Sequence, residues 1–340
     1  MLCLDVVPSH PLRRRFFVVL RQEINPPLPN KNRLDYFTGS FADCSRLFPN
    51  FLRPLAMPLT HRKFQRIFTL GPEGTFSNQA AQRVCGEGFD NIVYCLTLPQ
   101  VTSQVSQDEQ SLGVIPIENS VSGTVNAAQK SLIDFSAVII GELTIDVHYG
   151  LVAYGPLDQV KQYYCHAVAF NQCQRFVSQH LPQAQVLYSD SNMDSAARFT
   201  AAAGQPVAAI VPLSIAQDRP TLKPHLHAGL VEDEPNNRTR FLVIQKKPAE
   251  YTPDLSKAKT SIYIELHEDR HSLLFEVLRE FHVYNINLCR LESRPSRVRA
   301  WQYGFFIDFY NNQRTGACLE DFKRNRIEFK VLGSYDPVPQ

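Results

Sequence analysis

Between residues 67 and 246 the sequence alternates apolar runs with polar turns and helix-like segments. RIFTL precedes GPEGTFS, LGVIPI precedes ENSVSGTV, QVLYSD leads into SNMDSAARFTAAA, and PVAAIVP closes the series. Apolar runs of this length that end in turn residues are typical of buried strands, and strands that alternate with helices build an α/β sheet covered by helices. Ligands of such sheets bind at the carboxyl ends of the strands. We therefore expect an α/β region whose functional residues follow its strands.

The chain changes character on either side of this region. Residues 247–258 hold two prolines and several charges, which predicts a linker. Residues 259–335 follow with the order strand, helix, strand, strand, helix, strand, and this βαββαβ order is that of the ferredoxin-like arrangement. Residues 1–66 form a leader with eleven Lys or Arg against four Asp or Glu and no sustained helix or strand period. The leader is interpreted as a transit peptide, a loosely ordered extension, or an artefact upstream of a true start at Met57.

The composition excludes several classes of partner. The 340 residues include 35 basic and 33 acidic side chains, and a net charge of +2 is too balanced for a protein that mainly binds nucleic acid or an anionic membrane. The eight cysteines form no C-x-x-C pair and no cluster with histidines, so we expect reduced thiols, no metal and a cytoplasmic location. No apolar run approaches the roughly 20 residues of a membrane helix. A small-molecule ligand fits best.

The first motif is GPEGTFS at 71–77. It lacks the Lys of a P-loop and the spacing of a dinucleotide-binding turn. Its glycines permit a tight turn, and Thr75 and Ser77 stand where a helix begins, so that hydroxyl and backbone N–H groups converge there. Such a site favours a carboxylate or phosphate. The alternative is that Ser77 only caps its helix.

The second motif, GVIPIENSVSGTV at 113–125, repeats this design. A buried strand ends in Glu118, Asn119 and Ser120, and a helix is expected to begin near Gly123. Helix capping explains Ser120 but not the two polar residues before it. Two strand-to-helix turns of this kind suggest one site with two anion-binding edges.

The third motif is EDEPNNRTRFLVI at 232–244. Its proline and asparagines predict a turn. In the strand that follows, Thr239, Phe241 and Val243 fall on one face and Arg240 and Leu242 on the other. Thr239 is thereby expected at the mouth of a strand.

A fourth motif, ESRP, follows these three and lies inside the βαββαβ unit. The ordered set GPEGTFS, PIENS-x-x-G, N-x-TRF and ESRP resembles prephenate dehydratase with its regulatory ACT domain, over residues 67–335. The resemblance implies a two-lobed, periplasmic-binding-protein-like catalytic region with the active site between the lobes. It also implies conversion of prephenate to phenylpyruvate with loss of carbon dioxide and water, without a cofactor.

The resemblance implies roles for individual residues. Thr239 is the principal catalytic group, and because a threonine hydroxyl has a pKa far above 7, hydrogen-bond donation to the leaving hydroxyl suits it better than outright general-acid catalysis. Asn119 and Ser120 assist it. The expected substrate-binding residues are Thr75, Ser77, Glu118, Gly123, Arg240, Phe241 and Cys165. For Arg240 a structural pairing with Glu or Asp is the alternative, because its strand face opposes that of Thr239.

Two segments depart from the family pattern. The family's SHPQAL-x-QC helix entry reads CHAVAFNQC here, with Cys165 in place of serine. A Cys165–His166 nucleophile and base is disfavoured, because adjacent residues rarely point together. The phenylalanine site implied by the resemblance comprises Glu292, Ser293, Arg294, Pro295, Asn287 and Leu273, but His271 replaces a customary glycine, which a ligand needs for close approach.

The sequence therefore predicts a monofunctional prephenate dehydratase that phenylalanine feedback-regulates, assembled as a homodimer or homotetramer through ACT domains. An altered effector response and an ACT domain that only dimerises stay open. Arogenate dehydratase is the alternative enzyme, and a non-catalytic amino-acid sensor is the alternative of another class. Intact Thr239, Asn119 and Ser120 argue against the sensor.

Overall fold

A computed structural model describes residues 4–7, 17–20, 64–86, 91–265, 272–295 and 303–338. The chain forms two units, Met1–Met57 and Pro58–Gln340. In the first unit, strands β1 (Leu4–Val7) and β2 (Phe17–Leu20) pair antiparallel, where the sequence had predicted no regular element. The rest of the predicted leader up to residue 63, and His271, lie outside the described residues.

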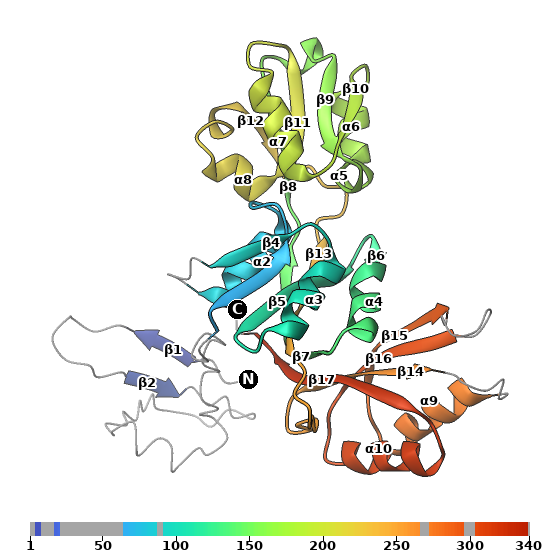
Figure 1. Ribbon diagram of the computed structural model, residues 1–340. Helices are drawn as coiled ribbons and strands as arrows, with labels where there is room; N and C mark the ends of the chain where they lie inside the picture. The colour runs from blue at the N-terminus through green and yellow to red at the C-terminus, as the bar shows by residue number, and fades with distance from the viewer. Residues whose placement is uncertain are drawn as a thin grey trace, which may run out of the picture. The chain divides into compact units, whose positions relative to one another are not determined.

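The second unit begins with a lobe built on a mixed sheet (Figure 1). Strands β3, β4 and β5 are parallel; β13 pairs antiparallel with β5, and β7 pairs antiparallel with β13. Helix α2 packs on one face, and α3 and α4 pack on the other. The elements are β3 (Arg66–Leu70), α2 (Phe76–Cys85), β4 (Ile92–Cys95), α3 (Leu98–Gln107), β5 (Ser111–Asn119), β6 (Gly123–Thr124), α4 (Asn126–Asp134), β7 (Ala137–Asp146) and β13 (Arg238–Lys246).

The second lobe is inserted between β7 and β13. The chain enters it through Val147 and His148 and returns through residues 230–237. Its sheet has the order β10-β9-β11-β8-β12, with α5 and α6 on one face and α7 and α8 on the other. The elements are β8 (Tyr149–Ala153), η2 (Leu157–Gln159), β9 (Gln162–His166), α5 (Ala167–Gln172), α6 (Gln174–His180), β10 (Gln185–Ser189), α7 (Asn192–Ala201), β11 (Val207–Pro212), α8 (Leu213–Asp218), η3 (Lys223–His225) and β12 (Leu226–Gly229).

The C-terminal region has the predicted βαββαβ order. Its strands lie in the order β15-β16-β14-β17 with antiparallel neighbours, which is the ferredoxin-like topology, and α9 and α10 cover one face. The fold class predicted from the sequence is thereby confirmed. The elements are β14 (Lys259–Glu265), α9 (Leu273–Val283), β15 (Leu288–Pro295), β16 (Tyr303–Tyr310), α10 (Thr315–Arg324) and β17 (Phe329–Pro337).

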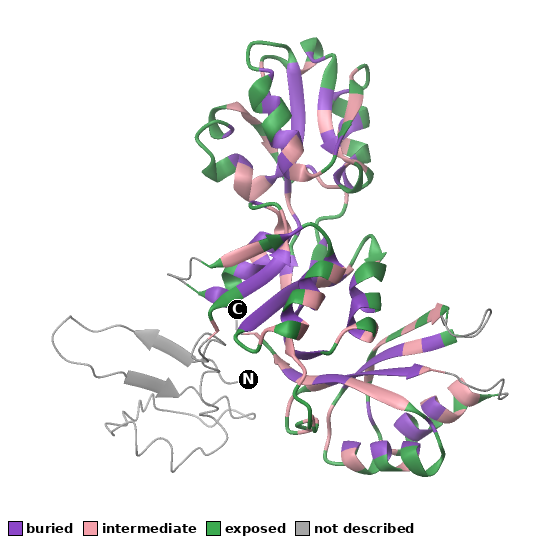
Figure 2. Cartoon of the chain, viewed as in Figure 1, coloured by how far each residue is buried: buried purple, intermediate pink, exposed green. Residues whose placement is uncertain are grey.

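The C-terminal region shares a sheet and a core with the first lobe. Strand β17 pairs in parallel with β7, which produces one sheet of ten strands. On the face away from α9 and α10, Tyr263, Phe306 and Tyr335 pack in the same buried cluster as Ile139 and Leu242 of the first lobe. Figure 2 shows buried residues on both sides of this junction. A segment predicted as a linker thus connects two regions that are packed together.

Gly333 lies where these two regions meet. A Cβ atom at this position would stand 2.2 Å from the carbonyl oxygen of Ile139, which is a backbone atom and cannot turn aside. Only glycine therefore allows β17 to approach β7 this closely.

We expect Gly333→Ala to lower the free energy of unfolding by about 3 kcal/mol, because the added methyl group forces β17 away from β7. Gly316→Ala is the matched control: Gly316 lies in α10, and its added Cβ would meet only Leu255 Cδ1 at 3.6 Å. This control should be neutral or stabilising by up to about 1 kcal/mol. Urea unfolding measures both variants, and equal effects would contradict the role assigned to Gly333.

Candidate functional site

The candidate site is formed where β5 ends and β13 begins. The two strands are antiparallel, and their register places Asn119 opposite Thr239. The Asn119 side-chain amide donates hydrogen bonds to Thr239 Oγ1 at 3.0 Å, to Asn237 Oδ1 at 2.8 Å and to the Arg238 carbonyl at 3.1 Å. The structure thus brings together the two residues that the sequence analysis placed at the centre of the chemistry.

Hydrogen bonds to the side-chain oxygen of Asn119 fix the orientation of its amide group. Asn119 Oδ1 accepts hydrogen bonds from the backbone N–H groups of Val121 (3.0 Å) and Ser122 (2.7 Å). Its NH2 group therefore has to face Thr239. Because the Thr239 oxygen accepts from Asn119, the hydroxyl proton is directed elsewhere and can be donated to a ligand.

Two further residues support this pair, and both escaped the sequence analysis as functional candidates. Asn237, only 1 % exposed, accepts from Asn119 and donates to Gln172 Oε1 at 2.9 Å. Gln172, at the end of α5, donates to Ser122 Oγ at 2.8 Å. A residue of the second lobe thereby contacts the loop after β5. The sequence motif N-x-TRF contains Asn237, but no role was assigned to it; its spacing of two from Thr239 was the available signal.

Ser120 and Gly123 shape the loop rather than face the Asn119–Thr239 pair. Ser120 Oγ donates to the Asn236 carbonyl at 3.2 Å and accepts from the Arg238 N–H at 2.9 Å, which joins β5 to the start of β13. Gly123 has φ of +79° and belongs to the short strand β6; the helix expected near it begins at Asn126. The left-handed backbone explains the glycine.

In the GPEGTFS loop the helix cap is Thr75, not Ser77. Thr75 Oγ1 accepts from the Asn78 N–H at 3.3 Å and donates to the Pro72 carbonyl at 3.0 Å, while Ser77 is buried in the first turn of α2. The sequence alternative in which Ser77 is the cap is therefore wrong. Ser77 comes two residues too late, because α2 begins at Phe76 and its cap position is therefore residue 75.

The same loop lies against the second lobe. A Cβ atom added to Gly74 would meet Met193 Sδ at 2.7 Å, and Gln79 Nε2 donates to Ser214 Oγ at 3.0 Å. The rings of Phe76 and Tyr149 pack edge to face with centroids 5.5 Å apart. Two predicted motifs, this loop and the β5–β13 end, are thus each in contact with the other lobe.

Four predicted substrate-binding residues lie elsewhere. Phe241 is 1 % exposed and packs in the core under α2, so it does not present its ring to a ligand. Cys165 is fully buried within the second lobe. Glu118 and Arg240 contact each other on the strand face opposite Thr239, with Arg240 Nε 2.9 Å from Glu118 Oε1. Of the two alternatives for Arg240, substrate binding and pairing with Glu or Asp, the structure shows the pairing.

Cys165 and His166 do not form a reactive pair. Burial raises the pKa of the Cys165 thiol to about 12 and lowers the pKa of His166. Both groups are therefore neutral near pH 7, and a thiolate nucleophile is disfavoured. The thiol makes a weak hydrogen bond to the His166 carbonyl at 3.4 Å.

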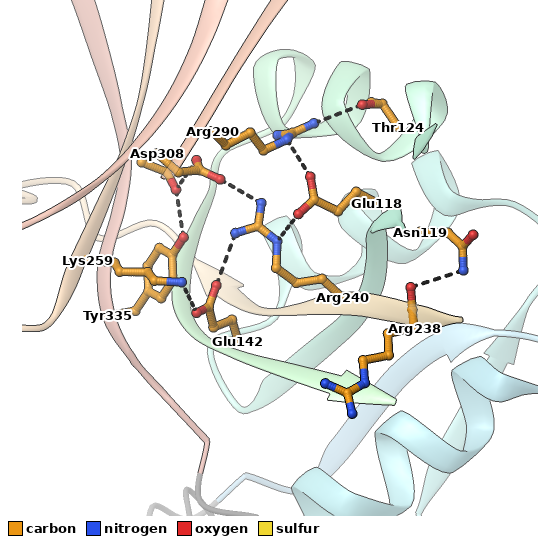
Figure 3. A network of polar contacts seen from close by, with 11 residues as sticks. Glu118, Asn119, Thr124, Glu142, Arg238, Arg240, Lys259, Arg290, Asp308 and Tyr335 are labelled. Carbon is orange, nitrogen blue, oxygen red and sulfur yellow. Dashed lines mark hydrogen bonds and ion pairs between the residues drawn. The ribbon is translucent and has the colours of Figure 1, made fainter. Parts of the chain in front are cut away.

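Arg240 is the centre of a buried ionic network (Figure 3). Its guanidinium contacts Glu142 at 3.1 Å and Asp308 at 2.6 Å in addition to Glu118. Lys259 Nζ lies 2.5 Å from Glu142, and Arg290 Nε lies 2.8 Å from Glu118. Burial lowers the pKa of Arg240, but the charges around it, Asp308 foremost, outweigh burial and raise this pKa above its ordinary value. Arg240 is thus held as a cation.

The predicted effector residues lie along the start of α9 and the strand β15. Leu273 is the first residue of α9, and the Asn287 carbonyl accepts a hydrogen bond from the Tyr310 N–H. Glu292, Ser293, Arg294 and Pro295 end β15. Arg294 hydrogen bonds within this chain to Asn126 and, at 3.1 Å, to Gln129 Oε1 of α4.

The described residues contain no group of three His, Cys, Asp or Glu side chains arranged to hold a metal ion. None of the described helices combines the length and the apolar character needed to cross a membrane.

The fold and the site define a two-lobed α/β protein with a polar site at the lobe junction and a ferredoxin-like C-terminal region. A family model described as prephenate dehydratase matches residues 67–249. Prephenate dehydratase of Methanocaldococcus jannaschii is 34 % identical over 274 residues, which cover 79 % of this chain and 97 % of the relative. The chain belongs to the prephenate dehydratase family.

Solved structures agree with this assignment. Prephenate dehydratase from Staphylococcus aureus superposes with a TM-score of 0.67 at 28 % identity, over 79 % of this chain and 99 % of the relative. Prephenate dehydratase from Arthrobacter aurescens in complex with L-Phe superposes with a TM-score of 0.69 at 30 % identity, over 80 % and 90 %. The family resemblance inferred from the four motifs is confirmed.

Replacing Arg240 with methionine should lower the free energy of unfolding by about 3–5 kcal/mol, because it leaves three carboxylates around an uncharged side chain. Arg238→Met is the matched control, since Arg238 forms an exposed pair with Asp146 and should cost less than about 1 kcal/mol. Urea unfolding at pH 7 measures both. A loss for Arg240→Met no larger than that for Arg238→Met would show that the network does not stabilise the fold.

Proposed function

We propose that this chain converts prephenate to phenylpyruvate, releasing carbon dioxide and water, and that phenylalanine regulates it. The observation that carries the proposal is the hydrogen bond from Asn119 to Thr239, which leaves the Thr239 hydroxyl proton free for a substrate. The family assignment supplies the substrate class.

The reaction requires the protein mainly to position the substrate and to donate hydrogen bonds to it. As the ring carboxylate leaves as carbon dioxide, its bonding electrons enter the ring and the carbon–oxygen bond of the ring hydroxyl breaks. The departing hydroxide takes up a proton from solvent to become water, and the ring becomes aromatic. Thr239 donates a hydrogen bond to that leaving oxygen, where negative charge develops, so the interaction strengthens in the transition state.

The substrate's two carboxylates need donors rather than a cofactor. Backbone N–H groups at the start of α2 suit a carboxylate, whereas the Thr75 hydroxyl beside them donates its proton to the Pro72 carbonyl. Gln172 and Asn237 hold Asn119 in place, so that the catalytic pair is pre-organised before substrate arrives.

Regulation and assembly are assigned to the C-terminal region. The Arthrobacter aurescens relative was solved with L-Phe, and here the β15 strand carries the ESRP residues at one end of the described sheet. An edge strand of this kind is available for pairing with a second copy, which supports a homodimer or homotetramer. The six described cysteines are free thiols, in accord with a cytoplasmic enzyme.

The test is the release of phenylpyruvate from prephenate by the full chain, with arogenate as the competing substrate and with and without phenylalanine. We expect turnover of prephenate and its inhibition by phenylalanine. A preference for arogenate would contradict the substrate assignment. A folded protein that binds phenylalanine but turns over neither substrate would be an amino-acid sensor.

Thr239→Ala should lower kcat by about 10²–10³-fold, the range for loss of a single transition-state donor. Thr239→Ser retains the hydroxyl and should keep most of the activity. The control is Thr200→Ala, an exposed helix residue of α7 whose hydroxyl only bonds the Ala196 carbonyl at 2.9 Å; its kcat should match wild type. Steady-state assays measure the three variants, and activity of Thr239→Ala within a few-fold of wild type would rule out this mechanism.

A further inference from the structure

A strand of the C-terminal region contacts the segment that carries the candidate catalytic asparagine. Arg290 on β15 places Nε 2.8 Å from Glu118 Oε2 and donates from Nη2 to Thr124 Oγ1 at 3.3 Å. Its side chain is only 7 % exposed. Figure 3 shows Arg290 approaching Glu118 from the side opposite Arg240. One guanidinium thus binds both ends of the loop between β5 and β6.

Glu118 is shared between two arginines. Arg240 contacts one carboxylate oxygen and Arg290 the other. Both contacts are ion pairs of similar length, 2.9 Å from Arg240 Nε and 2.8 Å from Arg290 Nε. Because each arginine holds a different oxygen, both are needed to keep the Glu118 carboxylate in one orientation.

The position of Glu118 determines the position of Asn119. The two residues are consecutive on β5, and they pair with Arg240 and Thr239 on β13. Consecutive strand residues point to opposite faces, so a side chain anchored on one face fixes the backbone from which the next side chain reaches the other face. The β5–β13 register also shifts between Arg240 and Phe241, so the ladder is interrupted beside the site and side-chain anchors matter more.

The charge balance of the network also indicates that Arg290 holds Glu118 in place. Its three cations are Arg240, Lys259 and Arg290, and its three anions are Glu118, Glu142 and Asp308. Loss of the Arg290 charge leaves two cations for three carboxylates. Glu118 is the most exposed of the three at 35 %, so it is the carboxylate that can turn toward water.

A second arginine of β15 extends the contact. Arg294 lies four residues beyond Arg290, on the same face of the strand, and hydrogen bonds to Asn126 and Gln129 of α4. Strand β15 therefore holds the chain from Glu118 to Gln129 at several points.

We infer that Arg290 is a positioning residue for the Asn119–Thr239 pair and acts through the Glu118 carboxylate. The inference rests on the proposed function. It means that the catalytic site is completed by a residue of the C-terminal region, which lies on the strand that also carries the predicted effector residues.

The test compares steady-state turnover of prephenate by full-length wild type, Arg290→Gln, Arg290→Lys and Glu118→Gln. Arg290→Gln should lower kcat by about 10- to 100-fold, the scale expected when a catalytic group is displaced, with KM changed less than about threefold. Arg290→Lys keeps the charge but cannot bridge Glu118 and Thr124, so its kcat should fall about fivefold. In the Arg290→Gln, Glu118→Gln double variant, kcat should fall no further than in the lower single variant.

Arg324→Gln is the matched control, because Arg324 forms an exposed pair with Asp321 on α10 and its kcat should stay within twofold of wild type. Thermal unfolding is measured on every variant. A lower melting temperature for Arg290→Gln with kcat within twofold of wild type would assign Arg290 a structural role only and overturn the inference. If Arg290→Gln does not fold, Arg290→Lys decides, and wild-type kcat in that variant would overturn it. A wild type that does not convert prephenate would overturn the proposed function and this inference with it.

Discussion

The pairing of β13 between β5 and β7 is the constraint on which the rest of the structure depends. Strand β13 is the segment by which the chain returns from the second lobe, and it is hydrogen-bonded along both edges. One of its faces carries Thr239 beside Asn119, and the other carries Arg240 among carboxylates. A single strand therefore joins the candidate catalytic pair, the lobe crossing and the interface with the C-terminal region.

The charged residues buried behind β13 would each destabilise the fold alone. They stabilise it only when every one of them has a partner of opposite charge. Moving charges out of water costs several kcal/mol per ion, and the mutual attraction of the ions offsets this only when each has a partner. Here Arg240 forms ion pairs with carboxylates from β5, β7 and β16. Ser261 hydrogen bonds to both Asp308 (2.6 Å) and the Tyr335 hydroxyl (2.8 Å). Partial opening would leave unpaired charges, so the network favours one relative placement of first lobe and C-terminal region.

Local pattern predicted the strands, the βαββαβ order and the opposite faces of Thr239 and Arg240, because these depend on residues close in sequence. It could not identify the partners of Arg240, since Glu142 and Asp308 lie far away in the chain. It was wrong for Phe241 and Cys165, because a residue next to a functional one can face the core. Gln172 and Asn237 were missed for a different reason: their contacts form only where the second lobe meets the first.

The C-terminal region belongs to the same sheet as the first lobe and is not a separately attached module. Because β17 pairs with β7 and the two regions share one core, a displacement of β15 cannot be absorbed by a flexible linker. It has to be absorbed either within the ferredoxin-like sheet or at the ion pair of Arg290 and the hydrogen bonds of Arg294. Packed cores resist gradual deformation, whereas ion pairs at a partly exposed carboxylate can exchange for water. Glu118 is therefore the point where a change on β15 would first reach the residues around Asn119.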